Sequence, residues 1–181
     1  RYTEFAYFKG SEEQLMELFN TSDTTVVIIP SSDKAFVSDI VSRLNTLTAK
    51  HTLILFGHPR WSKFDNIKLE FFHNLNTHLF ALSFPNYQSQ KVIDFIQIYR
   101  QYFNTEPQSR SYEGYDITKY FVEAIYNFSE NFRCCLDKFQ PELLHMKFKM
   151  SQLKEGAGYI NHHLYLVRFD KNFERTLVNI E

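Results

Sequence analysis

Polar side chains follow three apolar segments of this sequence, and they are the residues best placed to do chemistry. They are Ser31 and Ser32 after the first segment, His58, Arg60 and Trp61 after the second, and Tyr87 after the third. Hydroxyls, a guanidinium and aromatic rings suit a small polar ligand that also has an apolar part. Arg60 would pair with a carboxylate, and Trp61 would offer a ring for stacking. We therefore predict a ligand-binding site made of these six residues.

Each of these residues also has an ordinary structural explanation. Ser31 and Ser32 precede a predicted helix and would cap its first turn. His58 would be an exposed loop residue, and Arg60 would be solvated or bound in a salt bridge. Trp61 would fill the junction between a helix and the sheet. The sequence alone leaves these alternatives open.

Motifs for catalysis and for cofactor or metal binding are absent from the sequence. There is no GxGxxG or Walker A loop, no GxSxG elbow and no HExxH pair. No nucleophile with an adjacent base can be named. Cys134 and Cys135 are neighbours, a spacing that rarely gives a disulfide, so we predict that they only fill space. We expect no enzymatic activity, no catalytic residue, no cofactor and no metal site.

Composition limits the class of protein further. The 181 residues are 44% hydrophobic and 23% charged, which is typical of one globular domain. The net charge of −1 argues against a nucleic-acid partner. No apolar run approaches the roughly 20 residues of a membrane helix, so we predict no membrane span. The chain begins with Arg1, and we expect it to be a trimmed piece of a longer protein.

The elements that must position the candidate residues follow from hydrophobic patterns. Strands are predicted over Thr24–Ile29, His51–Phe56 and Thr77–Phe84, separated by segments of helical periodicity. The first two strands are apolar on both faces, which is typical of central parallel strands, so Ile28 and Leu55 should be buried. The carboxyl ends of parallel strands meet at one edge of a sheet, where ligands bind in this class of fold. The candidate residues should meet there.

The second half of the chain changes in pattern after Glu130. Amphipathic helices are predicted over Val92–Phe103 and Tyr115–Phe128, the latter with Phe121 in the core. Short alternating segments follow, with a hairpin turn at 170–172. We predict an α/β fold of three layers, α/β/α, with a mainly parallel sheet. Residues 1–130 would form the parallel-sheet portion, and 131–181 would add C-terminal antiparallel strands to the same domain.

The order of these segments resembles the later part of a type 1 periplasmic binding protein, from about Thr24 to Asn179. This family includes the leucine/isoleucine/valine receptors of ABC transporters. The helix that opens with 114–116 (GYD) resembles the family's GYDA helix. The segments 56–61 (FGHPRW), 75–77 (LNT) and 158–161 (GYIN) are similar to a branch found in bacterial cell-envelope proteins that carry LysM modules.

The resemblance implies a non-enzymatic, extracytoplasmic ligand-binding domain in the periplasm or cell envelope. Its ligand would be a small polar or amino-acid-like molecule, a peptide or a cell-wall fragment. By position, ligand contacts would come from Ser31, Ser32, His58 and Arg60, although Arg60 stands where the family has an acidic residue. The first segment of the two-lobe receptor and the LysM module, which would associate with peptidoglycan, are absent from this sequence. The alternative is a scaffold whose unused cleft serves contacts with proteins or peptidoglycan.

Overall fold

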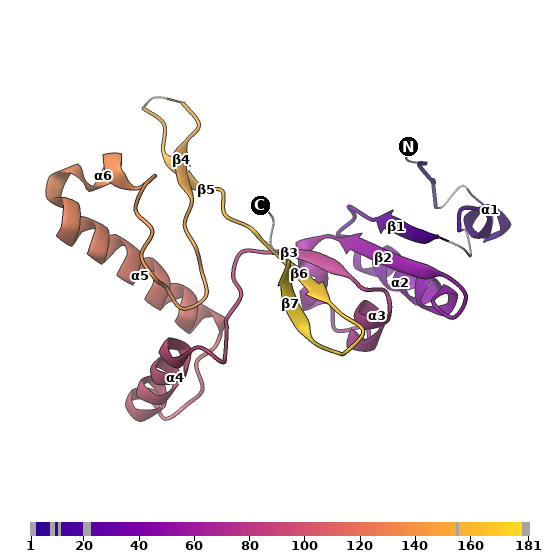
Figure 1. Ribbon diagram of the computed structural model, residues 1–181, viewed down its shortest axis with the longest axis horizontal. Coiled ribbons are helices and arrows are strands. Elements are labelled where there is room, and N and C mark those ends of the chain that lie inside the picture. Colours follow the sequence, from indigo (N-terminus) through magenta and orange to yellow (C-terminus); the bar gives the residue numbers. More distant parts are fainter. Residues whose placement is uncertain (1–2, 8–9, 11, 20–22, 155, 179–181) are drawn as a thin grey trace. The chain divides into compact units, whose positions relative to one another are not determined.

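The computed structural model describes residues 3–7, 10, 12–19, 23–154 and 156–178, and the chain is a mixed α/β protein of two compact units (Figure 1). The first unit comprises Arg1–Phe80 and Leu166–Glu181, and the second comprises Ala81–Tyr165. The second unit is therefore inserted in the sequence of the first. Our division at residue 130 concerned two portions of a single domain, and it stays a prediction.

The first unit is built around a five-stranded sheet of order β1-β2-β3-β6-β7. The chain runs through α1 (Glu12–Glu17), β1 (Thr24–Ile28), α2 (Lys34–Leu47), β2 (Thr52–Gly57), η1 (Pro59–Lys63), α3 (Leu69–Asn74), β3 (His78–Ala81), β6 (Tyr165–Phe169) and β7 (Arg175–Val178). Strands β1, β2 and β3 are parallel, and β6 and β7 form an antiparallel hairpin. The three predicted strands all form, in a sheet that is mixed.

One face of this sheet carries the core. In Figure 1, α2 and α3 lie on the same side of the sheet. Helix α2 buries Val37, Ile40, Val41 and Leu44, whose spacing of three, one and three residues gives one apolar stripe. On β2, Leu53 and Leu55 are also buried, two residues apart on one face of the strand. The predicted burial of Leu55 is confirmed.

The prediction of a central first strand is wrong. In the described part of the chain, strand β1 stands at one end of the sheet, and it pairs with β2 alone, Val26 beside Ile54 and Ile28 beside Phe56. The side chain of Ile28 is 72% exposed. Side chains alternate between the faces of a strand, so the apolar run TTVVI puts half of its residues on the second face. Among the described residues no helix of the first unit covers that half.

The C-terminal hairpin agrees with its predicted turn. The carboxylate of Asp170 accepts hydrogen bonds from the backbone N–H groups of Asn172 (2.9 Å) and Glu174 (3.1 Å), and so closes the turn between β6 and β7. His73 of α3 approaches this turn, with Nδ1 2.7 Å from the Asp170 carbonyl oxygen. The hairpin is thereby attached to the helical layer of the first unit.

The second unit is mainly helical. Its elements are α4 (Gln90–Phe103), α5 (Ser109–Phe128), η2 (Ser129–Asn131), α6 (Phe132–Cys135), β4 (Met150–Gln152) and β5 (Tyr159–Asn161). Strands β4 and β5 form an antiparallel ribbon. The core centres on Tyr120, whose hydroxyl donates to the Leu136 carbonyl oxygen at 3.0 Å. Phe121 only packs against this core and is partly buried, so its predicted central place is wrong. Helix position 120, and not 121, points inward.

The second unit also contains the two cysteines of the sequence. Cys134 and Cys135 are free thiols. Cys134 is exposed, so the packing role that we predicted for it is wrong, while Cys135 is partly exposed. No helix in the described part of the chain combines the length and the apolarity that crossing a membrane requires.

Candidate binding site

The loops that follow β1 and β2 lie next to each other at the carboxyl edge of the first sheet. The two strands end in register, since Ile28 pairs with Phe56, and the Ile29 N–H donates to the Phe56 carbonyl oxygen at 2.9 Å. One side chain then joins the loops: the indole Nε1–H of Trp61 donates to the Ser31 carbonyl oxygen at 2.8 Å. The sequence therefore predicted correctly that these two loops meet.

An ion pair makes a second connection between the same two segments. Lys34, the first residue of α2, binds the carboxylate of Asp65, which follows η1. This hydrogen bond and the positive charge of Lys34 lower the pKa of Asp65 below its ordinary value. Both side chains are largely exposed, so the pair adds little stability, but it restrains the ends of the two loops.

The loop after β1 presents one exposed hydroxyl. Asp33, and not either serine, caps α2: its carboxylate accepts from the Phe36 N–H at 2.7 Å. Ser31 is partly buried, and its hydroxyl accepts from the Asp33 N–H at 3.1 Å. Ser32 is exposed. The helix therefore does not need the Ser32 side chain as a cap, and this hydroxyl is available to a ligand.

The loop after β2 presents an imidazole and a guanidinium. His58 precedes η1, and its Nδ1 accepts from the Arg60 N–H at 3.1 Å. In the neutral imidazole this leaves the proton on Nε2, which is a donor. Arg60 is exposed, and within the described residues no carboxylate forms an ion pair with it. The edge thus offers a hydroxyl, an N–H donor and a cation, which together suit an anionic group.

Trp61 is not exposed beside these groups, and Tyr87 belongs to the other unit. Trp61 is completely buried and stacks on Phe72, with ring centroids 6.4 Å apart. A Cβ on Gly57 would lie 2.2 Å from the indole ring, so only glycine fits beneath it. Trp61 therefore has the packing role that the sequence left open, and it shows no ring face at the surface. Tyr87 is exposed and belongs to the second unit.

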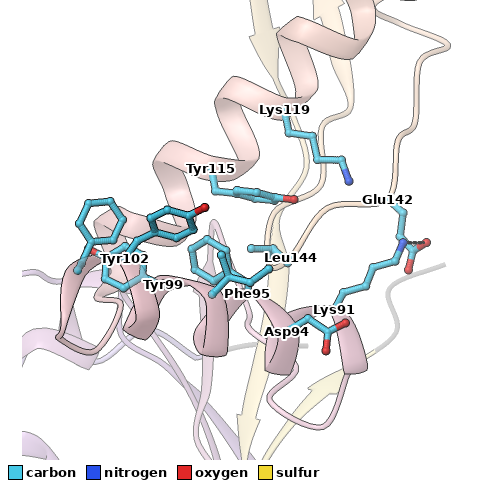
Figure 2. Close-up of a pocket in the computed structure, with 11 residues that line it drawn as sticks. Lys91, Asp94, Phe95, Tyr99, Tyr102, Tyr115, Lys119, Glu142 and Leu144 are labelled. Atoms are coloured by element: carbon cyan, nitrogen blue, oxygen red, sulfur yellow. Dashed lines mark hydrogen bonds and ion pairs between the residues drawn. The ribbon is translucent and has the colours of Figure 1, made fainter.

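The second unit contains a groove that sequence reasoning missed. Its volume is about 400 Å³ (Figure 2). The lining, here called the aromatic groove, comprises Lys91, Asp94, Phe95, Ile98, Tyr99, Tyr102 and Phe103 of α4, Tyr115 and Lys119 of α5, and Glu142 and Leu144. An amphipathic helix turns its apolar side chains to the core, but Phe103 of α4 is exposed. The available signal was the number of aromatic residues on α4, which exceeds what one buried stripe needs.

Aromatic rings contact one another along the aromatic groove, and charged side chains lie toward one end of it. Phe95 packs against Tyr99 of its own helix and Tyr115 of α5, with centroids 5.8 and 5.0 Å apart. Lys91 binds the carboxylate of Glu142, and this contact lowers the pKa of Glu142. The lining therefore has its rings toward one end and its charged side chains toward the other, as Figure 2 shows. Such a surface can hold an aromatic or aliphatic group.

A buried carboxylate fixes the segment that borders this groove. Asp116 of α5 is completely buried and accepts four hydrogen bonds, from the N–H groups of Leu144 (2.8 Å), His145 (2.9 Å) and Met146 (2.9 Å) and from the His145 ring at Nδ1 (2.6 Å). Burial alone would raise the pKa of Asp116, but the hydrogen bonds outweigh it and lower that pKa. Both oxygens of this fully buried carboxylate accept hydrogen bonds from one segment, so Asp116 holds a loop.

The surroundings of Asp116 are also buried. His145 is enclosed, and its Nε2 has no hydrogen-bond partner within the described part of the chain. Burial, together with the negative charge of Asp116, raises the pKa of Tyr165 to about 12. Sequence reasoning gave Asp116 no role, because the GYD motif stood out only through the family resemblance.

No group of three or more histidine, cysteine, aspartate or glutamate side chains is placed to hold a metal ion in the residues that the structure describes. Comparisons with known proteins found no match: no family model, no curated protein and no solved structure matches this chain. The case for a function therefore rests on the residues themselves and on the resemblance stated above.

Proposed function

We propose that this chain is a non-enzymatic ligand-binding domain of the periplasm or cell envelope, related to type 1 periplasmic binding proteins. Its ligand is a small molecule with an anionic group, such as an amino acid, a peptide or a cell-wall fragment. That group binds Ser32, His58 and Arg60 at the carboxyl edge of the first sheet. The observation that carries the proposal is the hydrogen bond from Trp61 to Ser31, because it holds the two loops that bear these side chains together.

Chain order gives further support. The first unit is an α/β sheet unit, the chain leaves it after Phe80 and returns at Leu166, and a second unit is formed in between. In a two-lobe receptor the chain likewise passes from one lobe to the other and back. We also propose that the three-layer α/β/α arrangement is completed when the exposed face of β1, with Val26 and Ile28, receives a second helical layer in the full receptor.

A titration followed by NMR tests the proposal. Amide shifts of the chain are recorded with amino acids, short peptides and cell-wall fragments. Saturable shifts at residues 31–33 and 57–61 are expected with one ligand class, and Arg60→Ala should weaken that binding by about tenfold or more without unfolding the chain.

The matched control is Arg110→Ala. Arg110 is an exposed arginine of the second unit that binds only its neighbour Glu113, so its loss should leave the affinity unchanged. An equal affinity in the Arg60 and Arg110 variants would remove Arg60 from the site. Shifts confined to the second unit would mean that the ligand does not bind at the carboxyl edge of the first sheet.

The alternative is a scaffold, a domain with the fold of a binding protein whose cleft is unused and which makes contacts with proteins or peptidoglycan. One observation favours it, since Trp61 is packed into the core and not open to a ligand. Exposed Tyr87, which a collapsed scaffold would also bury, does not favour it. A titration without shifts at residues 31–33 and 57–61 for any ligand would support the scaffold.

A further inference from the structure

The second unit has an apolar surface that its own core does not use. It is formed by Ile98, Tyr102 and Phe103 of α4 and by Tyr115, Val122, Ile125 and Tyr126 of α5, all exposed. The opposite side of α5 buries Tyr112, Asp116, Tyr120 and Ala124. A helix with apolar residues on its solvent side as well as its core side is normally covered on both.

This apolar surface contains a knob and a hole. The knob is Tyr126, whose side chain is 86% exposed. The hole is the aromatic groove, which Tyr115 lines. The two tyrosines are eleven positions apart on α5, so they lie on the same side of the helix and about 16 Å apart along its axis.

We propose that a second copy of this chain covers the apolar surface, with the two α5 helices antiparallel about a two-fold axis. In such a pair the knob of each copy enters the aromatic groove of the other, because a residue i that meets j is matched by j meeting i. Tyr115 of one copy then lies beside Tyr126 of the other. One contact, made twice, fills both grooves.

The charges along α5 fit the same arrangement. Lys119 is one turn beyond Tyr115, and Glu123 is one turn before Tyr126. When the helices run antiparallel, Lys119 of each copy lies beside Glu123 of the other. Within one copy the two charges are 3.7 Å apart, and their side chains remain partly exposed, so they can also interact across the pair. The two charge pairs therefore meet near the two-fold axis, at the centre of the contact, and the two tyrosine pairs lie at its ends.

The size of the apolar surface is in the range that a dimer needs. Its four aromatic side chains are between 41% and 86% exposed. At about 200 Å² for a complete aromatic side chain, they offer roughly 500 Å² on each copy. A standard interface takes about 800 Å² from each partner, and the three exposed aliphatic side chains supply much of the difference.

Sedimentation velocity over a concentration series from about 1 μM to about 1 mM tests the proposal. The wild-type chain should change from one copy to two. Tyr126→Ala should weaken the dimer by about thirtyfold or more, because each copy then loses the side chain that enters the aromatic groove of the other. The control is Leu153→Ala. Leu153 is an apolar residue of the second unit that is 71% exposed and lies outside the apolar surface, so its replacement should leave the dimer unchanged.

Charge reversal gives a sharper test. K119E places like charges in both central pairs of the contact, and so does E123K, so neither variant should form a dimer with itself. An equimolar mixture of the two variants restores opposite charges in both pairs and should form a dimer. Circular dichroism of each variant shows that the helices are intact.

Three outcomes would overturn the proposal. They are a wild-type chain that stays monomeric over the whole series, a dimer that Tyr126→Ala and Leu153→Ala affect equally, and a mixture of K119E and E123K that associates no better than either alone. A monomer that acquires partners only from other proteins would place a different occupant on the apolar surface.

Discussion

Replacement of Asp116 by asparagine tests how the second unit is held together. An asparagine side chain has the same shape as aspartate but only one acceptor oxygen. The aspartate uses Oδ1 for the Leu144 N–H and Oδ2 for the N–H groups of His145 and Met146 and for the His145 ring. The best placement of the amide therefore keeps three of the four hydrogen bonds and sets its NH₂ group against the Leu144 N–H.

The expected loss follows from those contacts. One buried backbone N–H without an acceptor costs about 1–3 kcal/mol. The three hydrogen bonds that remain lose the assistance of the negative charge, which makes charged hydrogen bonds about twice as strong as neutral ones. We expect Asp116→Asn to lower the free energy of unfolding by about 3 kcal/mol, within a range of about 2–5 kcal/mol.

Urea unfolding measures this loss with two probes. Trp61, which is the only tryptophan, reports on the first unit by fluorescence, and circular dichroism at 222 nm follows the helices of both units. The control is Asp94→Asn, since Asp94 is an exposed aspartate on α4 and its replacement should cost less than about 0.5 kcal/mol. If Asp116→Asn costs less than about 1 kcal/mol, the buried carboxylate does not hold the 144–146 loop as we argue.

The pH dependence gives an independent check. The pKa of Asp116 in the folded chain lies below its unfolded value, near 3.8. Its stabilisation is therefore complete above the unfolded pKa and is lost as the pH falls through the folded pKa. The wild-type chain should lose its advantage over Asp116→Asn as the pH falls below about 5 and through the folded pKa. A constant difference over that range would mean that the charge of Asp116 does not contribute.

Two further stability measurements by urea unfolding test the packing of the two units. Gly57→Ala should cost about 1–3 kcal/mol, because its Cβ would overlap the indole ring. Gly114→Ala should stabilise α5 by about 0.5–1 kcal/mol, since a Cβ there would meet no side chain among the described residues. Equal effects would contradict the tight fit at Gly57. Tyr120→Phe should cost about 1–2 kcal/mol by leaving the Leu136 carbonyl oxygen without its donor, and Phe121→Ala should cost less than the 3–5 kcal/mol typical of a central ring. A larger loss at Phe121 would mean that its ring does belong to the centre of the core.

The sequence predicted best what local patterns determine. The apolar run of β2, the stripe of α2 and the turn at Asp170 each depend on neighbouring residues, and each forms as expected. The meeting of the loops after β1 and β2 also followed, because parallel strands bring their carboxyl ends to one edge. Arg60 is exposed at that edge, as a ligand contact must be.

The sequence could not show which apolar residues lack a cover. Ile28 and Leu55 belong to runs of the same character, yet one is exposed and the other buried, because strand order decides which face has a helical layer. The same limit applies to α5, where Phe121 and Tyr120 are neighbours and only the latter is central. Asp116 was missed for a different reason, since its four donors come from a segment 28–30 residues away.

The insertion of one unit into the other has a consequence for synthesis on the ribosome. The second unit is one continuous segment, Ala81–Tyr165, so it can fold as soon as that segment has emerged. The first unit must wait, because β3 obtains its neighbour β6 only after the whole insertion has been made. Until then the edge of β3 is open to pairing with other chains, as any uncovered strand edge is. A pause in translation before β6 has emerged from the ribosome would therefore promote aggregation of this protein.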